Sequence, residues 1–85
     1  MTRRHIALIR GINVGRAKRV AMSDLRALVE KLGYGDVRTL LNSGNVVFSV
    51  PSSDRRNHAR RIEGAMPARL GLSARVTVLT AVGEN

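Results

Sequence analysis

The stretch VRTLLNSGNVVFSV, residues 37–50, decides the fold. Two runs rich in β-branched residues, Val37–Leu41 and Val46–Val50, flank the tetrapeptide Asn42-Ser43-Gly44-Asn45. β-branched residues favour extended backbone, while asparagine and glycine tolerate the positive φ angles of tight hairpin turns. The stretch therefore predicts a β-hairpin.

The residues before the hairpin predict one strand and one helix. His5–Arg10 is a short apolar run that ends at a glycine, as buried strands often do. Apolar residues then recur at three- and four-residue steps over residues 22–32, which is the stripe of an amphipathic helix. Ser23 is the expected N-cap, and Gly33 and Gly35 are expected to end the helix.

The residues after the hairpin predict a second helix and a last strand. Asp54–Leu70 carries an apolar side and several arginines. Pro67 is unfavourable inside a helix, so the helix is expected to end or kink near Ala65. Arg75–Thr80 alternates and is rich in valine and threonine, which predicts a strand, and the tail begins at about residue 81.

The resulting order is βαββαβ, the ferredoxin-like α+β arrangement, in one domain spanning residues 1–85. Right-handed crossovers place the first and third strands centrally in a four-stranded antiparallel sheet, with both helices on one face. The loop Gly11–Val20 and the turn Asn42–Asn45 should then lie at the same end of the sheet.

Alternation divides the strand residues between two faces. The face beneath the helices is expected to hold Ile6, Leu8, Val46, Phe48, Val50, Val76 and Val78. The opposite face is expected to hold Ala7, Ile9, Leu40, Val47 and Leu79, with Arg38, Ser49, Arg75 and Thr77. A face with this many apolar residues is expected to be covered, either by a second domain or by a second copy of the chain in a homodimer. The alternative is ordinary scattered apolar surface.

The positive net charge of the chain indicates which kinds of ligand or partner it would attract. Lys and Arg number 15 against 6 Asp and Glu, a formal net charge of +9, and the first carboxylate is Asp24. This surface attracts nucleic acid, nucleotides, phosphorylated metabolites or acidic partners, unless it is simply solvated. There is no cysteine, and the apolar stretch Ile6–Ile9 is too short for a signal peptide or a membrane span, so we expect a cytoplasmic protein.

A small-anion site is the leading functional hypothesis. It combines a glycine-bearing basic loop with the hairpin turn, and its residues are Arg10, Gly11, Asn13, Gly15, Arg16, Lys18, Ser43, Gly44 and Asn45. The loop matches neither the P-loop nor the dinucleotide-binding motif. The alternatives are that its glycines only allow the chain to turn, that its asparagines hydrogen-bond the local backbone, and that Arg10 pairs with Asp36 or a tail carboxylate.

Two other function classes stay open. Arg55, Arg56, Arg60 and Arg61 form a basic surface for nucleic acid, or else a solvated face. With 2% aromatic residues, base stacking on the sheet is not expected. An enzyme would need its site completed by dimerisation or by further chain, because no triad and no paired carboxylates are evident.

No metal and no cofactor are expected. His5 and His58 are separated by a whole fold, and neither has cysteine or a carboxylate set near it in the sequence.

Several segments resemble a known family. RGINVG at residues 10–15, followed by Lys18, Val20 and Met22, and VRT at 37–39 leading to SGNVVF at 43–48, resemble the bacterial DUF1697 family, which has no established activity. The resemblance runs from about Ile6 to Leu79 and implies the first of two ferredoxin-like halves, since members are about twice as long. The chain departs from the family pattern at Arg16, over residues 40–42, and at Pro67.

Overall fold

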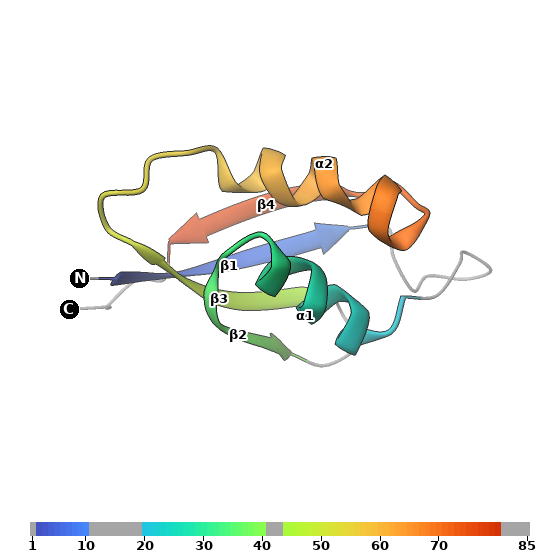
Figure 1. Cartoon of the computed structure of the whole chain (residues 1–85), viewed down its shortest axis with the longest axis horizontal. Coiled ribbons are helices and arrows are strands. Elements are labelled where there is room, and N and C mark those ends of the chain that lie inside the picture. The colour runs from blue at the N-terminus through green and yellow to red at the C-terminus, as the bar shows by residue number, and fades with distance from the viewer. Residues whose placement is uncertain (1, 11–19, 41–43, 81–85) are drawn as a thin grey trace.

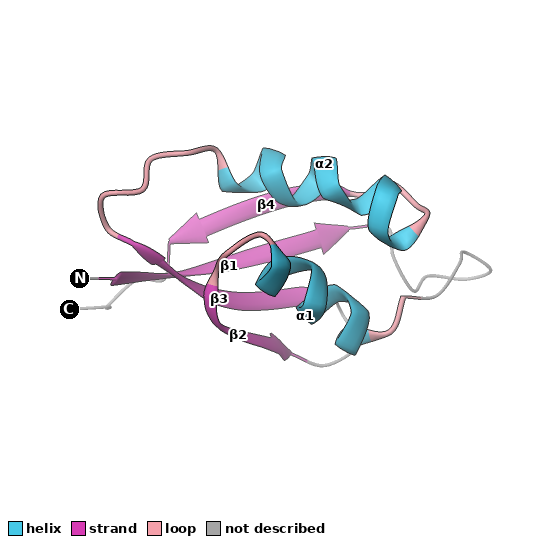
Figure 2. Cartoon of the chain, viewed as in Figure 1, coloured by secondary structure: helices cyan, strands magenta, loops and turns pink. Residues whose placement is uncertain are grey.

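The computed structural model describes residues 2–10, 20–40 and 44–80, and these residues form a ferredoxin-like fold (Figure 1). The elements are β1 (Thr2–Arg10), α1 (Met22–Lys31), β2 (Gly35–Leu40), β3 (Asn45–Pro51), α2 (His58–Leu70) and β4 (Arg75–Thr80). The four-stranded sheet has the order β2-β3-β1-β4, with every neighbouring pair antiparallel. Both helices cover one face of it (Figure 2). The predicted fold class and the central position of the first and third strands are confirmed.

The core lies between this covered face and the helices. Helix α1 contributes Leu25, Leu28 and Val29, and its neighbour α2 contributes Ile62 and Met66. The strand residues buried against them are Ala7, Ile9, Val37, Val46, Phe48, Val50 and Val76. Neither described helix is long and apolar enough to cross a membrane.

Strand β1 faces the opposite way from the prediction. Ala7 and Ile9, with 0% and 3% of their surface exposed, lie beneath the helices, whereas Ile6 and Leu8 are half-buried on the open face. The register is consistent with this, since Ala7 stands opposite buried Val46 and Ile6 opposite Val47. The four successive residues at 6–9 are all apolar, so the sequence does not indicate which of them point toward the helices. The pairing with β3 decides this, and we call the result the phase of β1.

The two helices also differ from their predicted limits. Helix α1 is preceded by Ala21 as N-cap, without a side-chain cap from Ser23. Helix α2 begins at His58 rather than Asp54, because Asn57 caps it by accepting a hydrogen bond from the Arg60 N–H at 3.0 Å. It continues through Pro67 to Leu70, and the Pro67 carbonyl accepts the Gly71 N–H at 3.1 Å. A proline this late in α2 leaves most of the helix undisturbed.

The end of β1 lies beside the start of β3. The Ile9 N–H donates to the Gly44 carbonyl at 3.1 Å, and Gly44 has the positive φ of 85° expected for this turn. The described residues that flank the first loop and the hairpin turn therefore meet at one end of the sheet, as the topology predicts.

The phase of β1 can be tested by truncating neighbouring residues. We expect Ile9→Ala to lower the free energy of unfolding by about 2–5 kcal/mol, because it removes core packing. Leu8→Ala, on the open face, should cost less than half as much. Urea denaturation of both variants measures the difference, and equal losses would contradict the observed phase.

Candidate functional site

A polar pocket lies at the end of the sheet where β1 begins, β4 ends and β3 leads into α2. Its volume is about 320 Å³. It is lined by Arg3, His5, Pro51, Ser52, Asp54, Arg55, Arg56, His58 and Thr80. Three of these side chains are arginine, two are histidine and one is acidic, so the arginines give the pocket a positive surplus that is suited to an anion.

The acidic group of this pocket is already engaged by Arg56. The Arg56 guanidinium donates to both carboxylate oxygens of Asp54, from Nε at 3.0 Å to Oδ1 and from Nη2 at 2.7 Å to Oδ2. The Arg56 backbone N–H donates to Oδ1 as well, at 3.0 Å. These hydrogen bonds hold the pKa of Asp54 well below its usual range. Arg3 and Arg55 have no ion pair within the described part of the chain, so the pocket keeps a positive surplus.

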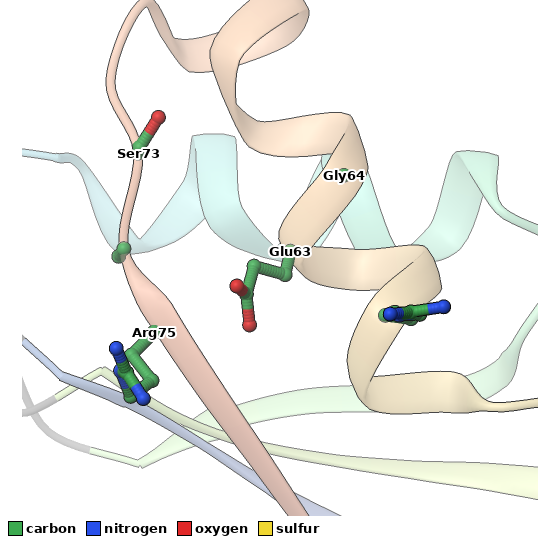
Figure 3. Close-up of a pocket in the computed structure, with 6 residues that line it drawn as sticks. Glu63, Gly64, Ser73 and Arg75 are labelled. Carbon is green, nitrogen blue, oxygen red and sulfur yellow. The ribbon is translucent and has the colours of Figure 1, made fainter.

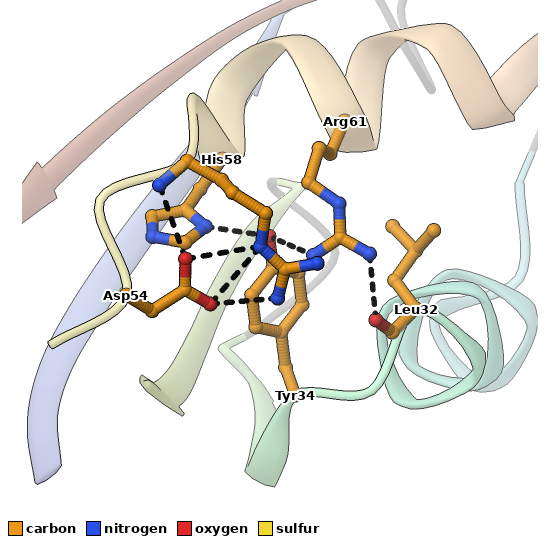
Figure 4. A network of polar contacts seen from close by, with 6 residues as sticks. Leu32, Tyr34, Asp54, His58 and Arg61 are labelled. Carbon is orange, nitrogen blue, oxygen red and sulfur yellow. Dashed lines mark hydrogen bonds and ion pairs between the residues drawn. The ribbon is translucent and has the colours of Figure 1, made fainter. Parts of the chain in front are cut away.

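A chain of hydrogen bonds supports the pocket from behind (Figure 4). Arg61 Nη1 donates to the Tyr34 hydroxyl at 2.9 Å, and the Tyr34 oxygen lies 2.6 Å from His58 Nδ1. A guanidinium only donates, so Tyr34 is the acceptor of the Arg61 hydrogen bond and its hydroxyl keeps one proton of its own. Burial raises the pKa of Tyr34, which keeps that proton in place.

Arg61 joins the two helices. Its Nη2 donates to the carbonyl of Leu32 at 2.9 Å, directly after α1, and its guanidinium carbon lies 5.1 Å from the centre of the Tyr34 ring. A cation at a helix C-terminus satisfies carbonyls that lack helical partners and complements the helix dipole. The Arg61 side chain is thus a structural link between α2 and α1.

His58 is held as a neutral ring in an aromatic cluster. Its ring lies edge-on to Tyr34 at 5.2 Å and to His5 at 5.4 Å, while His5 stacks on Phe48 at 5.7 Å. Burial lowers the pKa of His58, and the charge and backbone of Asp54 oppose that shift. His58 therefore supplies no charge to the pocket at neutral pH.

A larger hollow of about 530 Å³ lies between α2 and the start of β4 (Figure 3). Arg60, Glu63 and Arg75 are its charged residues. Glu63 Oε1 accepts the Val76 N–H at 3.1 Å, so this carboxylate anchors the first residues of strand β4 to helix α2. The carboxylate of this hollow is thus used for a structural contact.

Comparison with known proteins assigns the family. The sequence profile of DUF1697, described as a protein of unknown function, matches residues 1–82. The chain belongs to the DUF1697 family. The DUF1697 fold seen here also matches a solved structure, the conserved bacterial protein SP0830 from Streptococcus pneumoniae, with a TM-score of 0.78 and 28% sequence identity. That match covers 94% of this chain and 44% of SP0830, so this chain spans less than half of its relative. A search of curated proteins finds no match.

Only part of the predicted anion site of this DUF1697 chain falls within the described residues. Gly11, Asn13, Gly15, Arg16, Lys18 and Ser43 lie outside them. Arg10, Gly44 and Asn45 are described, and they lie together where β1 ends and β3 begins. Arg10 does not pair with Asp36, which instead binds Arg4 at 3.2 Å and Arg38 at 3.4 Å. Opposite Arg10 in the register stands Arg75, a second cation that the sequence analysis did not place there.

The four arginines proposed for nucleic acid do not share one helix face. Arg55 and Arg56 precede α2, Arg56 is bound to Asp54, and Arg61 is turned inward to Tyr34. Arg60 is the exposed member on α2 itself.

The sequence analysis missed the pocket because its histidines are far apart in the chain. The expectation that His5 and His58 are separated was wrong, since β1 runs beneath the start of α2 and brings the rings together. Within the described residues, no group of three His, Cys, Asp or Glu side chains is placed to hold a metal.

The hydrogen-bond chain predicts a pH-dependent stability. The folded state holds the pKa of His58 below its ordinary value of 6.5, so the unfolded chain takes up a proton first as the pH falls. We expect the free energy of unfolding to decrease between about pH 7.5 and pH 5.5, with a smaller slope in His58→Asn. Asp54, whose pKa is lowered, loses its contribution only under more acidic conditions.

Chemical denaturation across this pH range measures the slope. Arg26→Gln, which removes the exposed Arg26–Glu30 pair on α1, is the matched control and should retain the wild-type slope. Parallel profiles for the wild type and His58→Asn would show that His58 is not the titrating group.

Proposed function

We propose that this chain is a small-anion-binding module whose pocket at the start of α2 takes a phosphate-class ligand. The observation that carries the proposal is the composition of that pocket, three arginines around a single carboxylate that Arg56 already neutralises. A phosphate group entering it meets a positive surplus without displacing an internal partner of Arg3 or Arg55.

The backbone around the pocket supports the same ligand class. Helix α2 is 13 residues long and directs its N-terminus to this end of the sheet, where its dipole favours negative charge. The loop before α2 is held in place on both sides. The Asp54 N–H donates to the Pro51 carbonyl at 2.9 Å, and the Asp54 carboxylate accepts the Arg56 backbone N–H at 3.0 Å. A preorganised loop lowers the entropic cost of binding.

A small ligand fits these contacts better than a nucleic-acid backbone. Extended phosphate tracking needs several exposed cations in a row, and Arg56 and Arg61 are both engaged within the protein. A volume of about 320 Å³ suits a single phosphorylated compound.

The corner with Arg10, Gly44 and Asn45 is the second location for an anion. The register places Arg75 beside Arg10, and like charges opposite each other on neighbouring strands are unfavourable without a counter-ion. The same experiment separates the two locations, because they lie at opposite ends of the sheet.

Titration with inorganic phosphate and with a phosphomonoester, followed by backbone-amide NMR, tests the proposal. We expect saturable shifts at Arg3, His5, Arg55 and Arg56. Replacing Arg3 and Arg55 by glutamine should weaken binding by about tenfold or more, because charge-assisted hydrogen bonds to the anion are lost.

Arg26→Gln with Arg69→Gln is the control, since it removes the same charge from the exposed helix layer. Chemical-shift changes confined to Arg10, Gly44 and Asn45 would show that the anion binds at the corner rather than in the α2 pocket. No saturable shift with either probe would refute anion binding by the described residues.

A further inference from the structure

The register of the strands arranges the side chains of the open face in rows that run across the sheet. One row across the sheet reads Arg38, Val47, Ile6, Leu79, and the next reads Leu40, Asn45, Leu8, Thr77. Leu40 and Leu79 are the large apolar side chains that are most exposed, at 45% and 51%. The apolar centre of this face therefore extends over all four strands.

Arginines surround that apolar centre. Arg4 lies one row beyond Ile6 on β1, Arg10 and Arg75 lie one row beyond Leu8, and Arg38 lies on the outer strand. Asp36, the carboxylate beside this rim, is bound to Arg4 and Arg38. Arg10 and Arg75 have no ion pair to any described residue. An apolar patch with a charged border is typical of a protein interface.

We propose that this open face binds an amphipathic helix whose apolar stripe is flanked by carboxylates. An apolar stripe would cover the side chains of the two central rows, in the way that α1 and α2 cover the other face. Carboxylates on both sides of the stripe would reach the arginine rim and form charge-assisted pairs with it.

Charge argues against a second copy of the chain as the occupant. Two such faces brought together would place one arginine rim against another, and each chain already carries a net charge of +9. The solved relative SP0830 has more than half of its own chain outside the matched region, so further chain accompanies this fold in that protein.

Two synthetic helical peptides test the charge preference. Both have the same leucine stripe, and they differ in having either glutamates or lysines on its flanks. We expect the glutamate peptide to shift the methyl signals of Ile6, Leu8, Val47 and Leu79, and to bind about tenfold or more tightly than the lysine peptide at low salt. Added salt should narrow that difference, because exposed charges are screened.

Charge reversal makes the test specific to this face. Arg10→Glu with Arg75→Glu should invert the preference toward the lysine peptide. Arg60→Glu with Arg69→Glu makes the same change in net charge on α2 and should leave the preference for glutamate intact.

Three outcomes would overturn the proposal. One is equal binding of the two peptides, or binding of neither. Another is methyl shifts confined to the helix layer. The third is a concentration-dependent dimer in sedimentation that Leu8→Lys abolishes, which would make a second copy the occupant. Anion binding in the α2 pocket is independent of all three, because Arg3 and Arg55 lie outside this face.

Discussion

A sheet has two faces, and the helices of this chain cover one of them. Side chains alternate along every strand, so a central strand flanked on both sides must present residues to both faces. Strand β1 presents Ala7 and Ile9 to the helices and Ile6 and Leu8 to the open side. Because Ile6 and Leu8 are apolar, that constraint gives the open face an apolar centre.

The order of elements was predictable because each depends on local chemistry. The hairpin over residues 37–50 and the helix stripe over 22–32 need only neighbours in sequence. The phase of β1 was not predictable, because four successive apolar residues carry no alternation and the choice is made by pairing with β3. Helix α2 was predicted to begin at Asp54 but begins at His58, because Asn57 is the cap and Asp54 instead binds Arg56.

The supporting network of the pocket was beyond the reach of the sequence for a different reason. Tyr34 follows α1, His58 begins α2 and Arg61 lies one turn later, so no short motif contains the three. An arginine in a helix ordinarily indicates a solvated surface, and only the packing of α2 beside α1 turns Arg61 toward Tyr34 and Leu32. The anion site that was predicted rests on one loop and one turn, and most of its residues lie outside those described.

The charge of this chain acts at the surface because its carboxylates are already engaged. Asp36, Asp54 and Glu30 each bind arginine, and Glu63 accepts a backbone N–H of β4. Asp24, the remaining carboxylate of the described residues, lies in the first turn of α1, where the helix dipole favours it. Arg3 and Arg55 at one end of the sheet, and Arg10 and Arg75 at the other, have no ion pair with any residue that the structure describes. The positive charge of these arginines is balanced by solvent ions, by a bound anion or by an acidic partner. A bound anion differs from solvent ions in using the shaped pocket, and an acidic partner differs from them in covering the apolar centre of the open face.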